Sequence, residues 1–213
     1  MKKDGTSNIH PAAQMHAEEF RTGQISRREF LTRTTCLGVT TAAAYGLLGM
    51  PLPAVAQTTP RQGGTLRLNM ETKALKDPRT WDWTEYANFC RGWLDYLTKF
   101  NRDGTVTGSL VESWDVNETA DSYTLHLRPG VTWNNGEPFK AADVAVNFAL
   151  WADGDVQGNS MAARVAGLQD PTTKKLREGA VTVVDDLTLT LSLSAPDISV
   201  MAALSDYPAA AVH

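Results

Sequence analysis

Few residues of this chain are of the types that carry out catalysis or bind metals. In residues 57–213 the histidines are His126, within an alternating apolar stretch, and His213. No G-x-S-x-G nucleophile motif occurs, and no Cys or His residues stand at metal-ligand spacing. Gly63 and Gly64 precede an alternating stretch, whereas phosphate-binding glycines follow a strand. The sequence therefore predicts no catalytic residue, metal or cofactor, and binding is the chemistry left to consider.

Aromatic side chains are the strongest binding signal. All six tryptophans lie between positions 81 and 151, and aromatic faces commonly line pockets for apolar solutes and peptides. Trp81, Trp83 and Tyr86 fall in or just after a loop that leaves the first expected strand, where ligand contacts concentrate. Glu71, at the end of that strand, can bind an amide or a cation; its alternative role is a solvated acid beside two lysines. The other tryptophans are predicted to pack in the core: Trp93, Trp114, Trp133 and Trp151.

These side chains must be held by a mixture of strands and helices. Period-2 alternation of apolar residues predicts strands at 63–70, 114–116, 123–127, 181–184 and 187–193. Helical spacing predicts helices at 84–100, 141–151, 161–165 and 196–204. Thr84 is the expected N-cap of the first helix, and Cys90 is expected on its packed face. A loop is expected at 73–82 and a turn at 101–104.

The N-terminal stretch has the order of an export signal. Arg27 and Arg28 precede an uncharged run at 37–50, whose 14 residues fall short of the roughly 18 to 20 that a membrane span needs. The small-x-small triplet Ala54-Val55-Ala56 follows, as in sites that signal peptidases cut. We therefore expect residues 1–56 to be a signal peptide and the mature chain, 57–213, to begin at Gln57.

The arginine pair refines this expectation. Residues 26–31 read Ser-Arg-Arg-Glu-Phe-Leu and resemble the twin-arginine consensus, whose machinery exports folded proteins. Arg27 and Arg28 would be the residues that the export receptor recognises, since a planar guanidinium offers a fixed hydrogen-bonding fork. The alternatives are a general secretory signal and an uncleaved anchor. Cys36 lacks the small apolar residues that precede a lipid-attachment cysteine, and its removal would leave only Cys90, so no internal disulfide is expected.

Composition indicates an ordinary globular protein. The 213 residues are 42% hydrophobic and 21% charged, with a formal charge of −4. Of the 20 Lys/Arg and 24 Asp/Glu, six and four lie in residues 1–56, so residues 57–213 keep 14 and 20, a charge of −6. An acidic chain of this kind argues against a nucleic-acid partner.

A longer and more specific pattern runs from Gly108 to Phe148. It contains an L-x-E-S-W step, a Y-T-x-x-L-R-x-G-V-x-W hairpin and an N-G-x-P-F-x-A-x-D-V turn into a helix. This pattern resembles the extracellular solute-binding proteins of family 5, the peptide- and nickel-type periplasmic receptors of ABC importers. Flanking stretches agree, so the resemblance covers residues 63–205. The matching positions are Leu110, Glu112, Ser113, Trp114, Tyr123, Thr124, Leu127, Arg128, Gly130, Val131, Trp133, Gly136, Pro138, Phe139, Ala141, Asp143 and Val144.

The resemblance implies a mixed α/β fold of the type II periplasmic-binding-protein kind. In that family two lobes close over a peptide or similar small solute, which is then delivered to an ABC permease in the inner membrane without covalent chemistry. Family members are much longer, so residues 57–213 are expected to form an incomplete N-terminal lobe that cannot enclose a ligand alone. Lys140 stands where the family usually has Thr or Ser, which removes an N-cap that typically stabilises by about 1 kcal/mol.

Two other classes remain open at the sequence level. Folded export often serves cofactor-dependent redox enzymes, so a periplasmic enzyme is the main alternative to a solute receptor. The absence of cofactor ligands in the sequence argues against it. A nonfunctional remnant of a truncated gene is the second alternative, and it is compatible with the receptor family.

Overall fold

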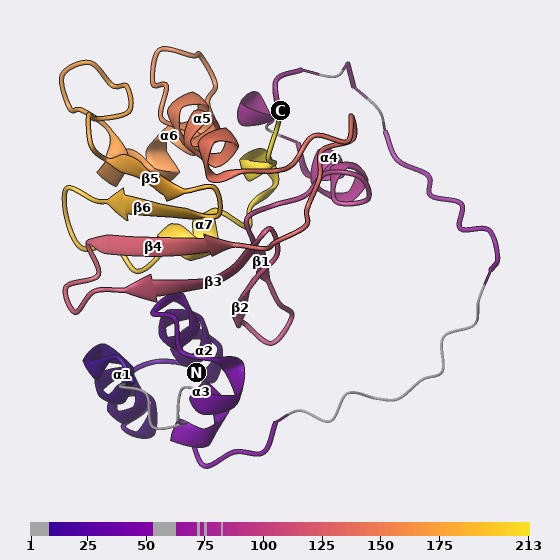
Figure 1. The fold of residues 1–213 in the computed structure, drawn as a ribbon. Helices are drawn as coiled ribbons and strands as arrows, with labels where there is room; N and C mark the ends of the chain where they lie inside the picture. Colours follow the sequence, from indigo (N-terminus) through magenta and orange to yellow (C-terminus); the bar gives the residue numbers. More distant parts are fainter. Residues whose placement is uncertain (1–8, 53–62, 72, 75, 82) are drawn as a thin grey trace.

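The computed structural model describes residues 9–52, 63–71, 73–74, 76–81 and 83–213. The described chain is a mixed α and β structure in which a sheet is flanked by helices (Figure 1). Its strands are β1 (Thr98–Phe100), β2 (Val106–Gly108), β3 (Val111–Val116), β4 (Ser122–Leu127), β5 (Val181–Asp185) and β6 (Thr188–Ser192). Its helices are α1 (Pro11–Arg21), α2 (Arg27–Cys36), α3 (Thr41–Leu47), α4 (Thr84–Cys90), α5 (Ala141–Trp151), α6 (Ser160–Arg164) and α7 (Val200–Ala203), with 3-10 turns η1 (Pro78–Thr80), η2 (Ala166–Leu168) and η3 (Tyr207–Ala209).

The main sheet has four antiparallel strands in the order β3-β4-β6-β5. On β4 the side chains of Tyr123, Leu125 and Leu127 are buried, and Leu191 and Leu189 of β6 stand opposite Tyr123 and Leu125, respectively. They share one apolar core with α5. Each such fully buried side chain contributes roughly 1.5 to 3 kcal/mol. The strands predicted at 114–116 and 123–127 pair as β3 with β4, and those predicted at 181–184 and 187–193 pair as β5 with β6, so these four predictions are confirmed.

Helix α5 begins at Ala141 as predicted, although Lys140 provides no side-chain cap. The carboxylate of Asp143 accepts a hydrogen bond from the Lys140 backbone N–H at 2.9 Å, so the third helical residue reaches back to the preceding residue. The Lys140 ammonium pairs with Asp186 at 3.0 Å. The start of α5 is thus stabilised by Asp143 in place of a side-chain cap from Lys140.

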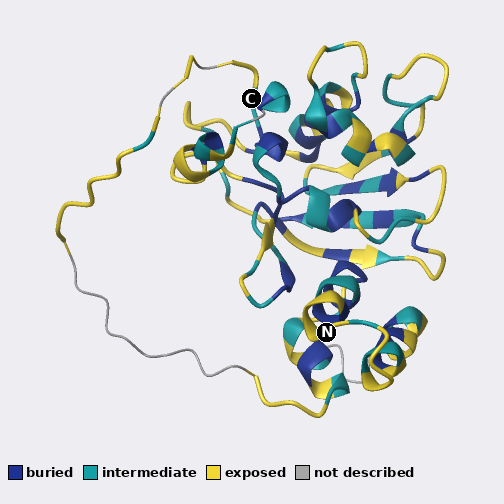
Figure 2. Cartoon of the chain, turned by 180° about the vertical axis from the view of Figure 1, so that it is seen from behind, coloured by how far each residue is buried: buried dark blue, intermediate teal, exposed yellow. Residues whose placement is uncertain are grey.

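The predicted strand at 63–70 is wrong. Residues 63–71 form neither a helix nor a strand and pair with no described strand, and Leu66 and Leu68 are 82% and 66% exposed. Figure 2 shows the described part of this segment as an exposed excursion away from the sheet. Alternation creates a strand only where a partner supplies the hydrogen bonds and covers the apolar side, and neither is present here.

The predicted helix at 84–100 is too long, because α4 ends at Cys90. A turn at 91–93 follows, and the chain then enters the β1–β2 hairpin around the expected turn at 101–104. Phe89 and Trp93 are 51% and 55% exposed, so the predicted core role of Trp93 is wrong. Thr84 is the first helical residue, not the N-cap, while Cys90 is buried as expected. The predicted helix at 196–204 is likewise reduced to α7.

The N-terminal helices α1, α2 and α3 pack around their own small apolar cluster. Its buried members are Ala17, Phe30, Leu31, Ala44 and Tyr45. Helix α2 also contacts β2 and α7, which places the three helices beside the β3 side of the sheet (Figure 1). Within the described residues, no helix is long and apolar enough to cross a membrane. The predicted cleavage site after Ala56 lies outside the described residues.

Candidate functional site

An aromatic group forms where the loop at 73–83 meets α4. The rings of Trp81 and Tyr86 are stacked, with centroids 5.2 Å apart and planes 13° from parallel. Trp83 meets the edge of Tyr86 at 5.1 Å, and the Lys73 ammonium lies 4.5 Å from the Trp83 ring centroid. The Trp81 indole N–H donates to the carbonyl of Lys76 at 2.9 Å. Trp81 and Tyr86 are buried, so their positions are fixed by packing as well as by hydrogen bonds.

This group borders a cavity of about 490 Å³ at one end of the main core. Aromatic side chains from three separate segments line it: Trp81, Trp93, Trp133 and Phe139. The aliphatic part of the wall comes from Pro78, Leu94, Leu110, Val131, Ala211 and Val212, and the polar part from Lys76, Asp95, Thr132, Asn134, Asn135 and His213. A mostly apolar lining that also contains polar groups is the usual form of a small-molecule site.

The loop between β4 and α5 holds Trp133 in the cavity wall. The backbone N–H of Trp133 bonds to the Glu137 carbonyl, and the N–H of Gly136 bonds back to the Trp133 carbonyl at 2.9 Å. Gly136 has a φ of 88°, a conformation that favours glycine. The Trp133 indole N–H donates to Asp143 at 3.0 Å, and the ring meets Phe139 edge-on. The indole is therefore held by the same carboxylate that stabilises the start of α5.

Residues 211–213 form a further part of the cavity wall. The N–H of Ala211 donates to the Asp95 carbonyl at 3.0 Å, which attaches this segment beside the α4–β1 connection. His213 reaches Glu137 at 2.8 Å, and its ring lies edge-on to Trp133 at 5.1 Å. The two walls thus touch through His213 and Trp133 on one side of the cavity.

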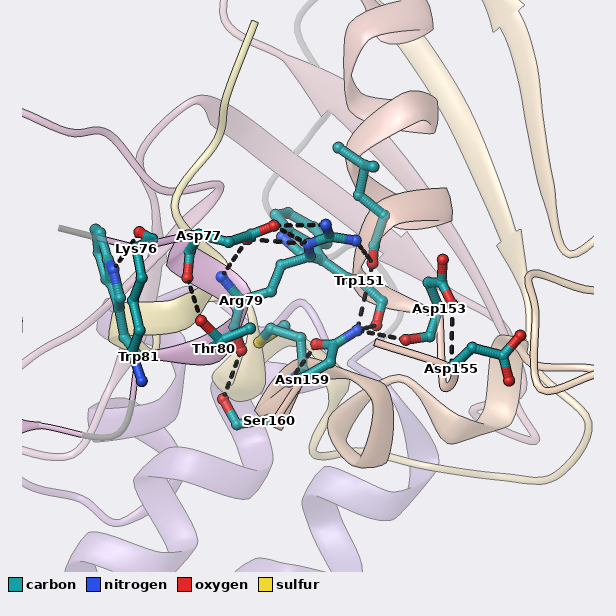
Figure 3. A network of polar contacts seen from close by, with 12 residues as sticks. Lys76, Asp77, Arg79, Thr80, Trp81, Trp151, Asp153, Asp155, Asn159 and Ser160 are labelled. Carbon is teal, nitrogen blue, oxygen red and sulfur yellow. Dashed lines mark hydrogen bonds and ion pairs between the residues drawn. The ribbon is translucent and has the colours of Figure 1, made fainter. Parts of the chain in front are cut away.

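A polar network anchors the loop that carries Trp81 (Figure 3). The Arg79 guanidinium grips Asp77, with Nε 3.0 Å from both carboxylate oxygens, and its Nη1 donates to the Leu150 carbonyl at 2.9 Å. The Ser160 hydroxyl donates to the Arg79 carbonyl at 3.2 Å. This hydrogen bonding by Arg79 lowers the pKa of Asp77 despite the opposing effect of burial. The loop is therefore attached to the C-terminal end of α5 and to α6.

Of the predicted site residues, only Trp81 lines the cavity. Tyr86 stacks on Trp81 and Trp83 packs on Tyr86, but neither lines the cavity, and Glu71 is exposed and absent from the lining. The sequence predicts Trp93 and Trp133 to be core residues, whereas both line the cavity. Each of these two tryptophans stands next to a turn, and this position is the feature of the sequence that could have indicated a role in a binding site. Trp114 and Trp151 are buried as predicted.

The remaining candidates lie elsewhere. Arg27 and Arg28 start α2 and are exposed; Arg27 bonds to the Tyr45 hydroxyl at 3.0 Å. His126 sits in β4 and contacts Asp115 at 2.9 Å across the β3–β4 pair, in agreement with a simple strand position. Among the described residues, no group of three or more His, Cys, Asp or Glu is arranged to hold a metal ion.

The fold is that of a part of a periplasmic binding protein. OppA of Listeria monocytogenes, solved with bound peptide, superposes with a TM-score of 0.57 at 20% identity over 64% of this chain and 28% of that one. The unliganded open form of the murein tripeptide-binding protein MppA gives 0.54 at 21% identity, with the same coverage of both chains. Residues 105–213 match the model of the bacterial extracellular solute-binding proteins, family 5 Middle. The chain belongs to this family.

Curated relatives match over more of the chain. A probable peptide ABC transporter periplasmic-binding protein, y4tO of Sinorhizobium fredii, is 28% identical over 156 residues, which cover 72% of this chain and 27% of the relative. Periplasmic OppA of Escherichia coli is 27% identical over 167 residues, covering 75% and 30%. The chain therefore spans less than a third of the length of these relatives.

Proposed function

We propose that this chain is the N-terminal part of a periplasmic substrate-binding component of an ABC transporter, and that it takes a peptide or a similar small solute. The observation that carries the proposal is the aromatic cavity, which three separate segments build in a chain of this family. Aromatic walls suit an apolar side chain, while Asn134 and Asn135 offer amide groups at the margin. The peptide-binding relatives support this class of solute.

The mechanism would be binding without covalent chemistry. This lobe would present one wall of the site, and a second lobe would close over the solute by a hinge motion before delivery to a permease. The cavity suits such a role, because the Arg79 network fixes the loop that carries Trp81 in the cavity wall. A rigid wall limits the ordering cost that binding would otherwise carry.

We also propose that residues 1–56 act as a twin-arginine export signal cleaved after Ala56, and that residues 57–213 remain in the periplasm. Arg27 and Arg28 would be read by the export machinery. Their exposed position at the start of α2 supports access to them. Replacement of both by Lys should abolish processing in a host with the twin-arginine system; continued processing would favour a general secretory signal.

Solute binding can be tested on the full chain by tryptophan fluorescence. The chain is titrated with pools of di-, tri- and tetrapeptides, and each active pool is resolved to single peptides. We expect weak, saturable binding, since one wall alone excludes little water. Trp81→Leu and Trp133→Leu should each weaken it by about tenfold or more. Phe20→Leu, in the separate α1–α3 cluster, is the matched control and should bind unchanged.

Two results would contradict the proposed peptide binding or the assignment of the cavity. A chain that responds to no peptide pool up to millimolar concentration would remove the peptide proposal. Equal weakening by Phe20→Leu and Trp81→Leu would show that the fluorescence reports general unfolding and would contradict the assignment of the cavity.

A further inference from the structure

The N-terminal helices are joined to the rest of the chain by specific polar bonds. The backbone N–H of Val106 in β2 donates to the Thr35 hydroxyl at 2.9 Å, and the Trp114 indole N–H donates to the Cys36 carbonyl at 3.0 Å. Both bonds are buried, and they connect residues 71 and 78 positions apart. A buried donor that loses its acceptor is costly, so each bond is a defined attachment point of α2.

Two further bonds hold the tip of the β1–β2 hairpin. The Thr32 hydroxyl donates to the Gly104 carbonyl at 2.6 Å, and the Tyr45 hydroxyl donates to Asp103 at 3.1 Å. Gly104 lies directly under α2: a Cβ built at this position would be 3.0 Å from the Arg28 carbonyl. The hairpin tip and α2 therefore fit closely, with no room for a side chain at Gly104.

The packing of the N-terminal helices divides the arginine motif into two parts. Arg27 and Arg28 remain exposed, with Arg28 placed over the Phe100 ring at 5.5 Å. Phe30 and Leu31, the apolar residues of the same motif, are fully buried. Phe30 and Leu31 pack among α1, α2 and α3, while Cys36 at the end of α2 joins the main core. A receptor could thus reach the guanidinium groups but not the apolar half of the motif.

We propose that the N-terminal segment that carries α2 docks on the folded lobe of its own chain. This docked state competes with recognition of the segment by the export machinery. The docking surface is the β1–β2 hairpin together with β3 and α7, and its occupant is α2 of the same chain. Its attachment points lie on 103–114, so the contact forms only when this part of the lobe has folded. The contacts alone support the docking. Its effect on export rests on the proposed signal function of residues 1–56.

Docking predicts that Cys36 is protected. The chain has two cysteines, so Cys90→Ala leaves Cys36 as the sole thiol. In the intact chain we expect maleimide to label Cys36 at least about 100-fold more slowly than in urea, because the residue is buried and a thiolate is the reactive form. Thr35→Val and Trp114→Phe each remove one attachment bond and should speed labelling by about tenfold. Circular dichroism establishes that each variant is folded.

Matched controls separate docking from general loosening. Thr35→Ser keeps the acceptor and should keep the protection. Thr22→Val removes a hydroxyl whose bonds stay within α1 and should leave the rate unchanged. Labelling of the intact chain as fast as in urea, or no acceleration in either attachment variant, would overturn the docking.

Export provides the second readout. In cells with the twin-arginine system, a pulse-chase of the full chain should show faster conversion of precursor to mature protein for Thr35→Val than for Thr22→Val. If conversion were unchanged or slower while Cys36 labelling became faster, the docked contact would still be supported, but its competition with export would be overturned. Neither readout uses a solute, so the peptide proposal stands or falls separately.

Discussion

The side chain of Asn147 pairs with both backbone groups of Val212. Its Nδ2 donates to the Val212 carbonyl at 2.7 Å, and its Oδ1 accepts from the Val212 N–H at 2.9 Å. The Asn147 side chain is buried on α5, so the helix that supports the sheet also fixes one wall of the cavity. A side-chain amide that forms both bonds imitates a strand partner for a segment that has none.

Asn147→Ala should destabilise the full chain by about 2 kcal/mol, because it leaves two backbone groups of Val212 without partners. The free energy of unfolding is measured by urea denaturation. Asn88→Ala, at an exposed position of α4, is the control and should change stability by less than about 0.5 kcal/mol. Equal effects of the two substitutions would contradict the role of Asn147.

Arg79→Lys should cost about 1 kcal/mol although the charge is kept, because an ammonium cannot grip Asp77 and reach the Leu150 carbonyl at once. Arg79→Ala should cost about 2 to 3 kcal/mol. Both should broaden the emission of the tryptophan cluster, since Trp81 lies directly after η1. Urea denaturation and fluorescence spectra check this. A fully stable Arg79→Lys chain would show that the fork geometry is unimportant.

The Asp77–Arg79 pair also predicts a pH dependence. The hydrogen bond from Arg79 lowers the pKa of Asp77 in the folded chain, with burial acting in the opposite direction. The ionised form is thus favoured by folding. Its contribution to stability is present above the unfolded pKa of about 3.9 and is lost as the pH falls through the lower folded value. Asp77→Asn should flatten this part of the stability profile between pH 5 and acid unfolding.

The control for this profile is Glu112→Gln, which removes one exposed acid on β3. Its urea midpoints, measured across the same pH series, should parallel those of the unmodified chain. A profile for Asp77→Asn that also parallels the unmodified chain would contradict the role of the pair.

The fold was predictable where apolar alternation and turn residues coincided. Tyr123, Leu125, Leu189 and Leu191 alternate strictly, and the structure buries all four. Leu66 and Leu68 alternate just as strictly and are exposed. The difference is the presence of a paired strand, which depends on segments far away in the chain. A local pattern therefore predicts the capacity to pair, not the partner.

The candidate site was less predictable for a related reason. Trp81 stands out as a loop aromatic, but Trp93 and Trp133 match the spacing of buried residues equally well. They enter one cavity because α4 ends early and because the 131–139 loop closes on itself. Helix α4 ends at Cys90, and Tyr96 and Leu97, just before β1, are buried in the main core instead of continuing the helix, so tertiary packing overrides helical spacing here.

Residues 57–213 produced alone should unfold less cooperatively than the full chain and aggregate more readily. β3 and β5 form the two margins of the main sheet, and removal of α2 also takes away the acceptors of the Val106 and Trp114 N–H groups. Exposed strand margins and unpaired buried donors favour association between chains. Urea denaturation with light scattering compares residues 57–213 with 1–213. A sharp two-state transition of a monomeric 57–213 chain, at the same midpoint as the full chain, would contradict both effects.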